Sequence, residues 1–203
     1  MFFRLRGMVS SVRKPELTDV DNLKKWLASP DFGTYLGGIT GESDQYYENL
    51  VGVMLNENAD EYSLTKHYII EDLFTERAIG LWTLSRIDWK NKNLQSSYII
   101  GEKQFRGSLV AGDVNIVMIN YIFEELNIHK IYSYTYDNNQ VAQRMNNFGG
   151  THDAILKAHK YINGIAVDVH VHSLTRGAFD EFVRKHATGV LRRHIQAKFL
   201  RSR

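Results

Sequence analysis

The spacing of hydrophobic residues predicts one strand and two helices in the first part of the chain. Residues 9–13 predict a short strand, and from residue 18 hydrophobic side chains recur at helical spacing. Residues 31–41 are rich in glycine and predict a loop. A second helix is predicted over residues 43–55, with Ser43 as its N-cap.

Three runs with strand character follow, at residues 62–71, 78–87 and 96–101. Short polar turns separate them. Strands this close in sequence are expected to be antiparallel neighbours. This part of the chain therefore predicts a sheet built from consecutive strands.

The pattern changes at residue 101. A basic loop with glycines spans residues 101–112, and a helix over 113–126 and a strand over 130–136 follow. This order of strand, loop, helix and strand is a βαβ unit. The strands at 96–101 and 130–136 should therefore run parallel.

The last part of the chain predicts a helix over residues 138–148 and two strands at 151–159 and 165–174. With the preceding elements this gives a mixed α+β fold. We expect a single domain over residues 1–182 and a basic helical extension over 183–203.

Composition excludes several classes of protein. The 203 residues suit one domain with a sizeable core. The chain has no cysteine, so disulfides, thiolate metal sites and a cysteine nucleophile are excluded. The first six residues are too short and too charged for a signal peptide, and no apolar run approaches a membrane span. We expect a cytoplasmic protein.

Charge is distributed unevenly. Seven basic residues and no acid follow Glu181, and the rest of the chain has 18 basic and 23 acidic residues. A mildly acidic body argues against nucleic-acid binding. In the tail, Leu191, Ile195 and Phe199 stand at helical spacing. This predicts a helix docked on the domain or on a second subunit, with contact to an anionic membrane surface as the alternative.

The loop over residues 101–112 carries the main chemical signal. A glycine-containing turn that leads into a helix presents unpaired backbone N–H groups, which bind anions with help from the helix dipole. Lys103 and Arg106 add positive charge beside them. The alternative is a plain connection between a strand and a helix.

This loop resembles the pyrophosphate loop of the GNAT N-acetyltransferase superfamily. In the family motif an Arg or Gln is followed at fixed spacing by Gly and then by Gly or Ala. Here Arg106 and Ala111 match, and Leu109 replaces the middle glycine. Gly107 and Gly112 lie nearby and can supply flexibility.

The resemblance extends over most of the chain, through the strand AIGLWTLSRID, the YINGIAVD hairpin and the helix after Asn138. It is closest to the branch of ribosomal-protein N-terminal and amino-sugar-nucleotide acetyltransferases. It implies a mostly antiparallel sheet, splayed between the strands at 96–101 and 130–136 and flanked by helices.

The resemblance also implies that acetyl-CoA lies in this splay, with its pantetheine arm along the 96–101 strand. The implied cofactor contacts are Tyr98, Ile99, Ile100, Gly101, Gln104, Arg106, Gly107, Ser108, Leu109, Val110, Ala111, Gly112 and Asn138. The backbone N–H of Ile100 would polarise the thioester carbonyl. The acceptor amine would then attack directly, without an acyl-enzyme intermediate.

Direct attack requires groups that accept and donate protons. Gln95 and Met145 stand where relatives carry a glutamate base and a tyrosine acid. Asp88 is therefore the preferred catalytic candidate, since a carboxylate can also bind an ammonium group, and Tyr134 is a second. His67, Tyr68, Tyr136 and His159 are further candidates, each of which is also explained as a surface or core-edge residue.

Histidines on the last strand raise the question of a metal. His170 and His172 alternate with Asp168 on one strand face, a pattern that metal ligands show but that a solvent-facing strand shows equally. We expect no metal cofactor. No nucleophile-elbow pattern is present, which argues against a hydrolase.

These features together predict acetyl transfer from acetyl-CoA to a primary amine. The expected acceptor is a small molecule such as an amino-sugar nucleotide. The alternatives are a protein N-terminus as acceptor and a non-catalytic acyl-CoA-binding or interaction module. Docking of the C-terminal helix on a second copy of the chain would give a homodimer.

Overall fold

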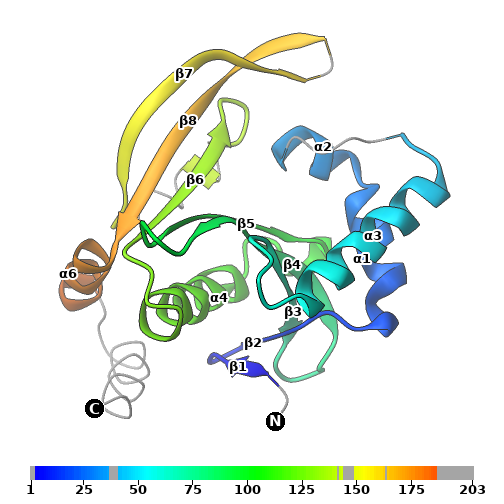
Figure 1. The fold of residues 1–203 in the computed structure, drawn as a ribbon, viewed down its shortest axis with the longest axis horizontal. Coiled ribbons are helices and arrows are strands. Elements are labelled where there is room, and N and C mark those ends of the chain that lie inside the picture. The colour runs from blue at the N-terminus through cyan, green and yellow to red at the C-terminus, as the bar shows by residue number, and fades with distance from the viewer. Residues whose placement is uncertain (1–2, 37–40, 141, 144–148, 163, 187–203) are drawn as a thin grey trace.

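One eight-stranded sheet, with helices on both faces, organises the chain (Figure 1). The computed structural model describes residues 3–36, 41–140, 142–143, 149–162 and 164–186. The strands are β1 (Arg4–Arg6), β2 (Ser10–Arg13), β3 (Lys66–Asp72), β4 (Ala78–Asp88), β5 (Asn93–Ile100), β6 (Lys130–Tyr136), β7 (Thr151–Ile162) and β8 (Ile165–Thr175). The helices are α1 (Val20–Leu27), α2 (Pro30–Leu36), α3 (Asp44–Ala59), α4 (Leu109–Asn120), which continues as the π-helix η3 (Tyr121–Glu125), and α6 (Arg176–His186). The predicted mixed α+β fold is confirmed.

The sheet opens in its middle, between β5 and β6. The strand order is β1-β2-β3-β4-β5-β6-β8-β7, and every pair is antiparallel except β5 with β6. That parallel pair, which the βαβ pattern predicted, joins only Asn93–Gln95 to Lys130–Tyr132. Beyond it the two strands diverge, while β5 stays paired with β4 as far as Gly80 opposite Ile100. The sheet therefore holds a gap whose wall is the second half of β5.

Two hydrophobic cores hold the sheet between its helices. On one face α4 and η3 bury their apolar side chains, with Val114, Met118 and Ile122 fully enclosed. On the other face α1 and α3 pack against β3 and β4 around Trp26 and Val51. Burial of this kind contributes about 1.5–3 kcal/mol for each large side chain.

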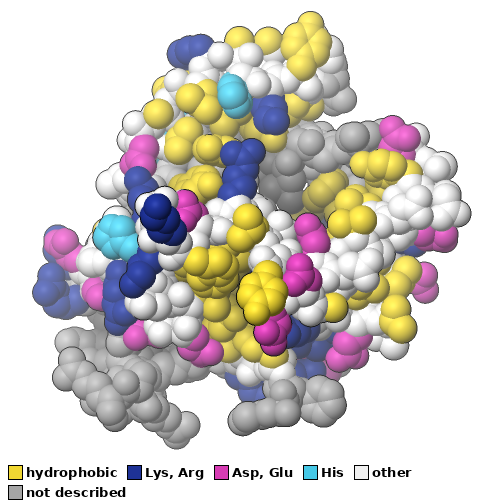
Figure 2. Space-filling view, viewed as in Figure 1, with side chains coloured by type: hydrophobic (Ala, Val, Ile, Leu, Met, Phe, Trp, Pro, Cys, Tyr) yellow, Lys and Arg dark blue, Asp and Glu magenta, His cyan; other side chains and the backbone are white. Residues whose placement is uncertain are grey.

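The β7–β8 hairpin extends beyond both cores. It arches over the sheet toward α2 (Figure 1), and it forms the upper part of the molecule in the space-filling view (Figure 2). Large apolar side chains on the hairpin remain exposed, among them Tyr161 at 76% and Ile165 at 66%. The expectation of a homodimer stays a prediction that this exposed hairpin makes reasonable.

Two sequence predictions about helices were wrong. The glycine-rich stretch predicted as a loop over residues 31–41 contains α2, because Pro30 suits the first helical position and the Ser29 hydroxyl accepts a hydrogen bond from the Phe32 N–H at 3.3 Å. The helix predicted from residue 113 begins at Leu109, because Ser108 caps it by accepting from the Val110 N–H at 3.3 Å.

The predicted boundary at residue 182 falls inside α6, which buries Phe179 in the main core. The helical tail predicted around Leu191, Ile195 and Phe199 lies outside the described residues. Among the described residues no helix has both the length and the apolar character that crossing a membrane requires.

Asp113 ties the N-terminal hairpin to α4. Its buried carboxylate accepts hydrogen bonds from the backbone N–H groups of Met8, Val9 and Ser10, each at 2.9 Å, and from the Ser10 hydroxyl at 2.7 Å. Gly7 makes this approach possible, since a Cβ there would lie 2.1 Å from an Asp113 oxygen. One side chain thus satisfies the donors of a whole turn.

We expect Asp113→Asn to lower the free energy of unfolding by about 3 kcal/mol, because the amide turns a donor toward buried donors. Urea unfolding followed by circular dichroism measures the change. Asp21→Asn, on the exposed first turn of α1, is the matched control and should shift stability by less than about 0.5 kcal/mol. Equal midpoints for the Asp113 variant and the native chain would contradict this role.

Candidate active site

The open edge of β5 is the first part of the site. The side chains of Tyr98 and Ile100 point toward the α4 core, where Tyr98 stacks on Trp82 with ring centroids 4.6 Å apart and accepts a hydrogen bond from Asn115 at 2.8 Å. Burial raises the pKa of the Tyr98 phenol, so it stays neutral. With these side chains fixed, residues 96–100 present to the gap a backbone edge that β6 does not pair.

The N-terminus of α4 is the second part. Gly107 turns the chain with φ of 71°, a conformation that favours glycine, and Ser108 begins the helix. The amides of the first turn, at Leu109, Val110 and Ala111, are those that an α-helix leaves without helical partners. Leu109 is 80% exposed at this end. A helix of 12 residues directs its dipole at this point, which suits an anion.

Arg106 supports the loop more than it offers a free charge. Its guanidinium donates to the backbone oxygens of Ile100 at 2.8 Å and Gly101 at 3.3 Å, and it pairs with Asp31 of α2. The predicted loop residues Gln104, Gly107 and Gly112 are exposed. The loop is thus locked to the end of β5 and to α2 through one side chain.

Gly101 lets α1 approach the end of β5. A Cβ at this position would lie 2.3 Å from the Trp26 ring. The Trp26 indole N–H donates to Glu102 at 3.0 Å, and Lys25 donates to the same carboxylate at 2.6 Å, which lowers the pKa of Glu102. Helix α1 therefore covers the strand end that leads into the loop.

Asn138 lies in the exposed turn after β6. The neighbouring Asn139 accepts a hydrogen bond from the Ala142 N–H at 3.1 Å and so begins the following helix. Most of the predicted helix over residues 138–148, including Met145, lies outside the described residues. The predicted contact of Asn138 with the pantetheine arm stays a prediction.

The two catalytic candidates lie in different surroundings. Tyr134 is half-buried on β6, with its ring centroid 5.8 Å from that of Tyr132. Asp88 lies at the β4–β5 turn, where its carboxylate accepts from the Asn91 backbone and side-chain N–H groups, both at 2.8 Å. These bonds lower the pKa of Asp88. Asp88 is held by its own turn, and the expectation that it faces an acceptor cleft stays a prediction.

The two histidine candidates, His67 and His159, differ in burial. His67 is buried on β3 and contacts Glu57 at 2.8 Å and Thr83 at 3.1 Å, and burial lowers its pKa. These contacts fix it as a core-edge residue. His159 is exposed on β7.

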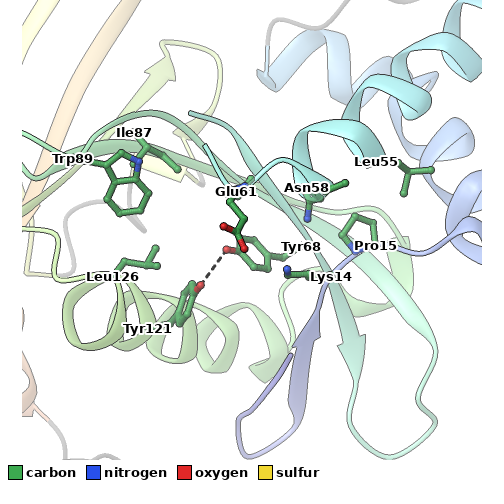
Figure 3. Close-up of a pocket in the computed structure, with 12 residues that line it drawn as sticks. Lys14, Pro15, Leu55, Asn58, Glu61, Tyr68, Ile87, Trp89, Tyr121 and Leu126 are labelled. Atoms are coloured by element: carbon green, nitrogen blue, oxygen red, sulfur yellow. Dashed lines mark hydrogen bonds between the residues drawn. The ribbon is translucent and has the colours of Figure 1, made fainter. Parts of the chain in front are cut away.

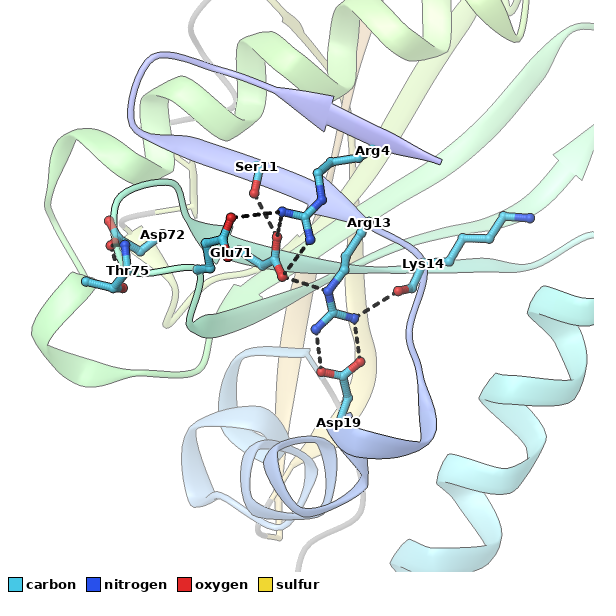
Figure 4. Close-up of polar contacts among 9 residues, drawn as sticks. Arg4, Ser11, Arg13, Lys14, Asp19, Glu71, Asp72 and Thr75 are labelled. Carbon is cyan, nitrogen blue, oxygen red and sulfur yellow. Dashed lines mark hydrogen bonds and ion pairs between the residues drawn. The ribbon is translucent and has the colours of Figure 1, made fainter. Parts of the chain in front are cut away.

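A buried ion network positions the helices beside the gap (Figure 4). Arg13 of β2 donates to Glu71 of β3 at 2.6 Å and to Asp19, at the start of α1, at 2.6 and 2.8 Å. Both acids are 2% exposed. Because α1 leads directly into α2, this network sets the place of both helices relative to β5.

A cavity of about 560 Å³ lies elsewhere, between the end of α3 and η3 (Figure 3). Tyr68 and Tyr121 share a hydrogen bond of 3.3 Å in its wall, and Trp89 closes one side. Trp89 follows β4 at the turn into β5, whereas the loop that leads into α4 follows the other end of β5. This cavity is therefore distinct from the gap and the α4 N-terminus.

Comparisons with known proteins identify the class that this geometry defines. Residues 11–147 match the family described as an acetyltransferase (GNAT) domain, so the chain belongs to that family. It is an N-acetyltransferase that binds acetyl-CoA and transfers the acetyl group to an amine. The alternative of a non-catalytic module is thereby disfavoured.

Solved structures share the fold. The spermidine N-acetyltransferase of Vibrio cholerae in complex with CoA and spermine has a TM-score of 0.73 and 21% identity, over 84% of this chain and 97% of that one. A probable acetyltransferase has a TM-score of 0.73 and 19% identity, over 86% and 98%. A GNAT-family acetyltransferase of Bacillus anthracis has a TM-score of 0.69 and 12% identity, over 85% and 98%. No curated protein matches the chain.

We expect Leu109→Asp to weaken CoA binding by about 10-fold, because a carboxylate at the α4 N-terminus repels the pyrophosphate. The same change should not lower the thermal midpoint, since an acid in the first turn favours the helix dipole. Calorimetry with CoA measures the affinity, and Leu109→Asn, of similar size without charge, is the control. Equal affinity of the Asp and Asn variants would remove the anion site from this helix.

Proposed function

We propose that the chain acetylates a primary amine of a linear polyamine, with acetyl-CoA bound in the gap between β5 and β6. The observation that carries the cofactor placement is the short β5–β6 pairing. It leaves residues 96–100 with a backbone edge that β6 does not pair, and residues 101–108 connect this edge to the α4 N-terminus. A pantetheine arm has amides that can bond to such an edge as an added strand does.

The chemical roles follow from this placement. The pyrophosphate would lie on the first-turn amides of α4, and the thioester carbonyl would accept a hydrogen bond from the Ile100 N–H, which stabilises the developing oxyanion. The neutral amine attacks the carbonyl carbon, its nitrogen releases a proton to solvent water, the C–S bond breaks, and the thiolate of CoA takes a proton. Tyr134, whose strand forms the other wall of the gap, is the proposed donor of that proton.

Asp88 has a different proposed role. A carboxylate whose pKa is lowered and which already accepts two hydrogen bonds is a poor base. Its lasting negative charge can attract a cationic acceptor instead.

Charge supports a polyamine over an amino-sugar nucleotide. Glu42 and Asp44 are exposed at the start of α3, the helix that follows α2 in the chain. Acidic groups there attract a polycation and repel the diphosphate of a sugar nucleotide. The Vibrio cholerae relative, which is crystallised with spermine, supports the same acceptor class.

An acceptor panel tests this proposal. Thiol release from acetyl-CoA is measured with spermidine, spermine, an amino-sugar nucleotide and a peptide with a free N-terminus. We expect the highest kcat/KM for a polyamine, falling as salt rises, because exposed charges are screened over about 10 Å at 0.1 M. A higher kcat/KM for the sugar nucleotide or the peptide would overturn the acceptor assignment.

We expect Tyr134→Phe to lower kcat by about 100-fold with little change in the KM for acetyl-CoA, because only proton transfer to the thiolate is lost. Steady-state kinetics on the best acceptor measures both constants. Tyr132→Phe, on the same strand with its ring centroid 5.8 Å from that of Tyr134, is the matched control. If both variants keep the native kcat, Tyr134 is not the proton donor.

A further inference from the structure

Three histidines meet on one face of the β6–β8–β7 half of the sheet. His172 of β8 lies directly opposite His152 of β7, and His170 lies two residues before His172 on the same strand. Their ring centroids are 4.9 Å apart for His152 and His172 and 5.0 Å apart for His152 and His170. One nitrogen from each ring lies within 4.8 Å of the others.

The chemistry of His172 points to a ligand. The side chain is 4% exposed, and among the residues that the structure describes neither of its ring nitrogens has a hydrogen-bond partner. A buried imidazole with both nitrogens unpartnered is destabilising, because no hydrogen bond compensates for the loss of water around them. Coordination of a metal would satisfy one of these nitrogens.

Asp137 orients His170 as a metal ligand. The carboxylate of Asp137 contacts Nε2 of His170, and Nδ1 of His170 faces Nε2 of His152 at 3.1 Å. When Nε2–H donates to the carboxylate, Nδ1 carries a lone pair directed at the cluster. A carboxylate behind a histidine is the usual outer contact of a metal-binding histidine, because it fixes the tautomer and the ring orientation.

We propose that His152, His170 and His172 form a binding site for a divalent transition metal ion, with Zn²⁺ as the first candidate. Three imidazole nitrogens suit zinc, copper or nickel more than magnesium or calcium, which prefer oxygen. A tetrahedral zinc ion with bonds of about 2.0–2.1 Å holds its nitrogen ligands about 3.3 Å apart, so the most separated nitrogens would converge by about 1.5 Å. The fourth position is left for water.

The site lies on the β6–β8–β7 half of the sheet and includes no residue of β5 or α4. In register His172 lies opposite Ser133, and His170 lies opposite Thr135, on β6. A metal bound here would join the edge strand β7 to β8 and, through Asp137, to the end of β6. The inferred role is structural: the ion stabilises the packing of β7, β8 and the end of β6 against one another.

Zinc binding to the chain without a polyhistidine tag tests the proposal. Zinc chloride is titrated by calorimetry in the absence of CoA, whose thiol would bind the ion. We expect one zinc per chain, and a rise in the thermal midpoint of about 5–10 °C when free zinc is 100-fold above its Kd. Absence of binding, or of any rise, would overturn the site.

Variants locate the ion. His152→Ala should lose the zinc-dependent rise, and Asp137→Asn should bind zinc 10–100-fold more weakly. His159→Ala, which removes an exposed histidine from the same strand β7, should behave as the native chain does. His152 is exposed, so its replacement leaves the core intact and tests the site even if His172→Ala does not fold. Native affinity in the His152 variant, or equal losses in the His152 and His159 variants, would refute the cluster as the site.

Discussion

The structure depends on the early end of pairing between β5 and β6. Backbone N–H and C=O groups inside a protein need partners, and a sheet normally supplies them from the next strand. Here β6 pairs with only three residues of β5 and then departs. Other elements follow from this divergence. The strands β6, β8 and β7 diverge from the rest of the sheet, and helices pack on both faces of the remaining half. The edge of β5 that β6 does not pair leads through a loop to the N-terminus of α4.

Rigid neighbours keep that edge open. Trp82 and Asn115 hold Tyr98 on one side, and Arg106 ties the backbone oxygen of Ile100 to the loop and to α2. Preformed donors on rigid elements lower the cost of ordering a site when a ligand binds. The proposed acetyl-CoA site is accordingly built from backbone groups whose positions are set by side chains that themselves take no part in the proposed chemistry.

Much of the fold could be predicted from periodicity, including the parallel pair, because a βαβ unit has one favoured arrangement. The misassigned segments were decided by single capping residues. Ser29 and Pro30 start α2 inside a glycine-rich stretch, and Ser108 starts α4 before the last glycine of the predicted loop. Glycine content favoured loops in both places. The hydrogen bond from a backbone N–H to a serine hydroxyl favours a helix instead, and which of the two signals decides is visible only in the folded structure.

The site was less predictable than the fold, because side-chain partners come from distant elements. Nothing in the sequence indicates that Arg106 bonds to Asp31, 75 residues away. The metal cluster shows the same limit. Alternation on β8 pointed to His170 and His172 with Asp168, but Asp168 pairs with Lys157 instead. The third histidine, His152, comes from β7, where an irregular register sets it opposite His172.

Hydrogen exchange of the backbone amides, with and without acetyl-CoA, tests the central claim most directly. The claim is that the cofactor completes the open edge of β5 and the first turn of α4. It predicts that acetyl-CoA slows exchange in residues 96–101 and 109–111, while the paired amides of β3 remain unchanged. Protection confined to the cavity beside Tyr68 and Trp89, with residues 96–101 unaffected, would contradict it.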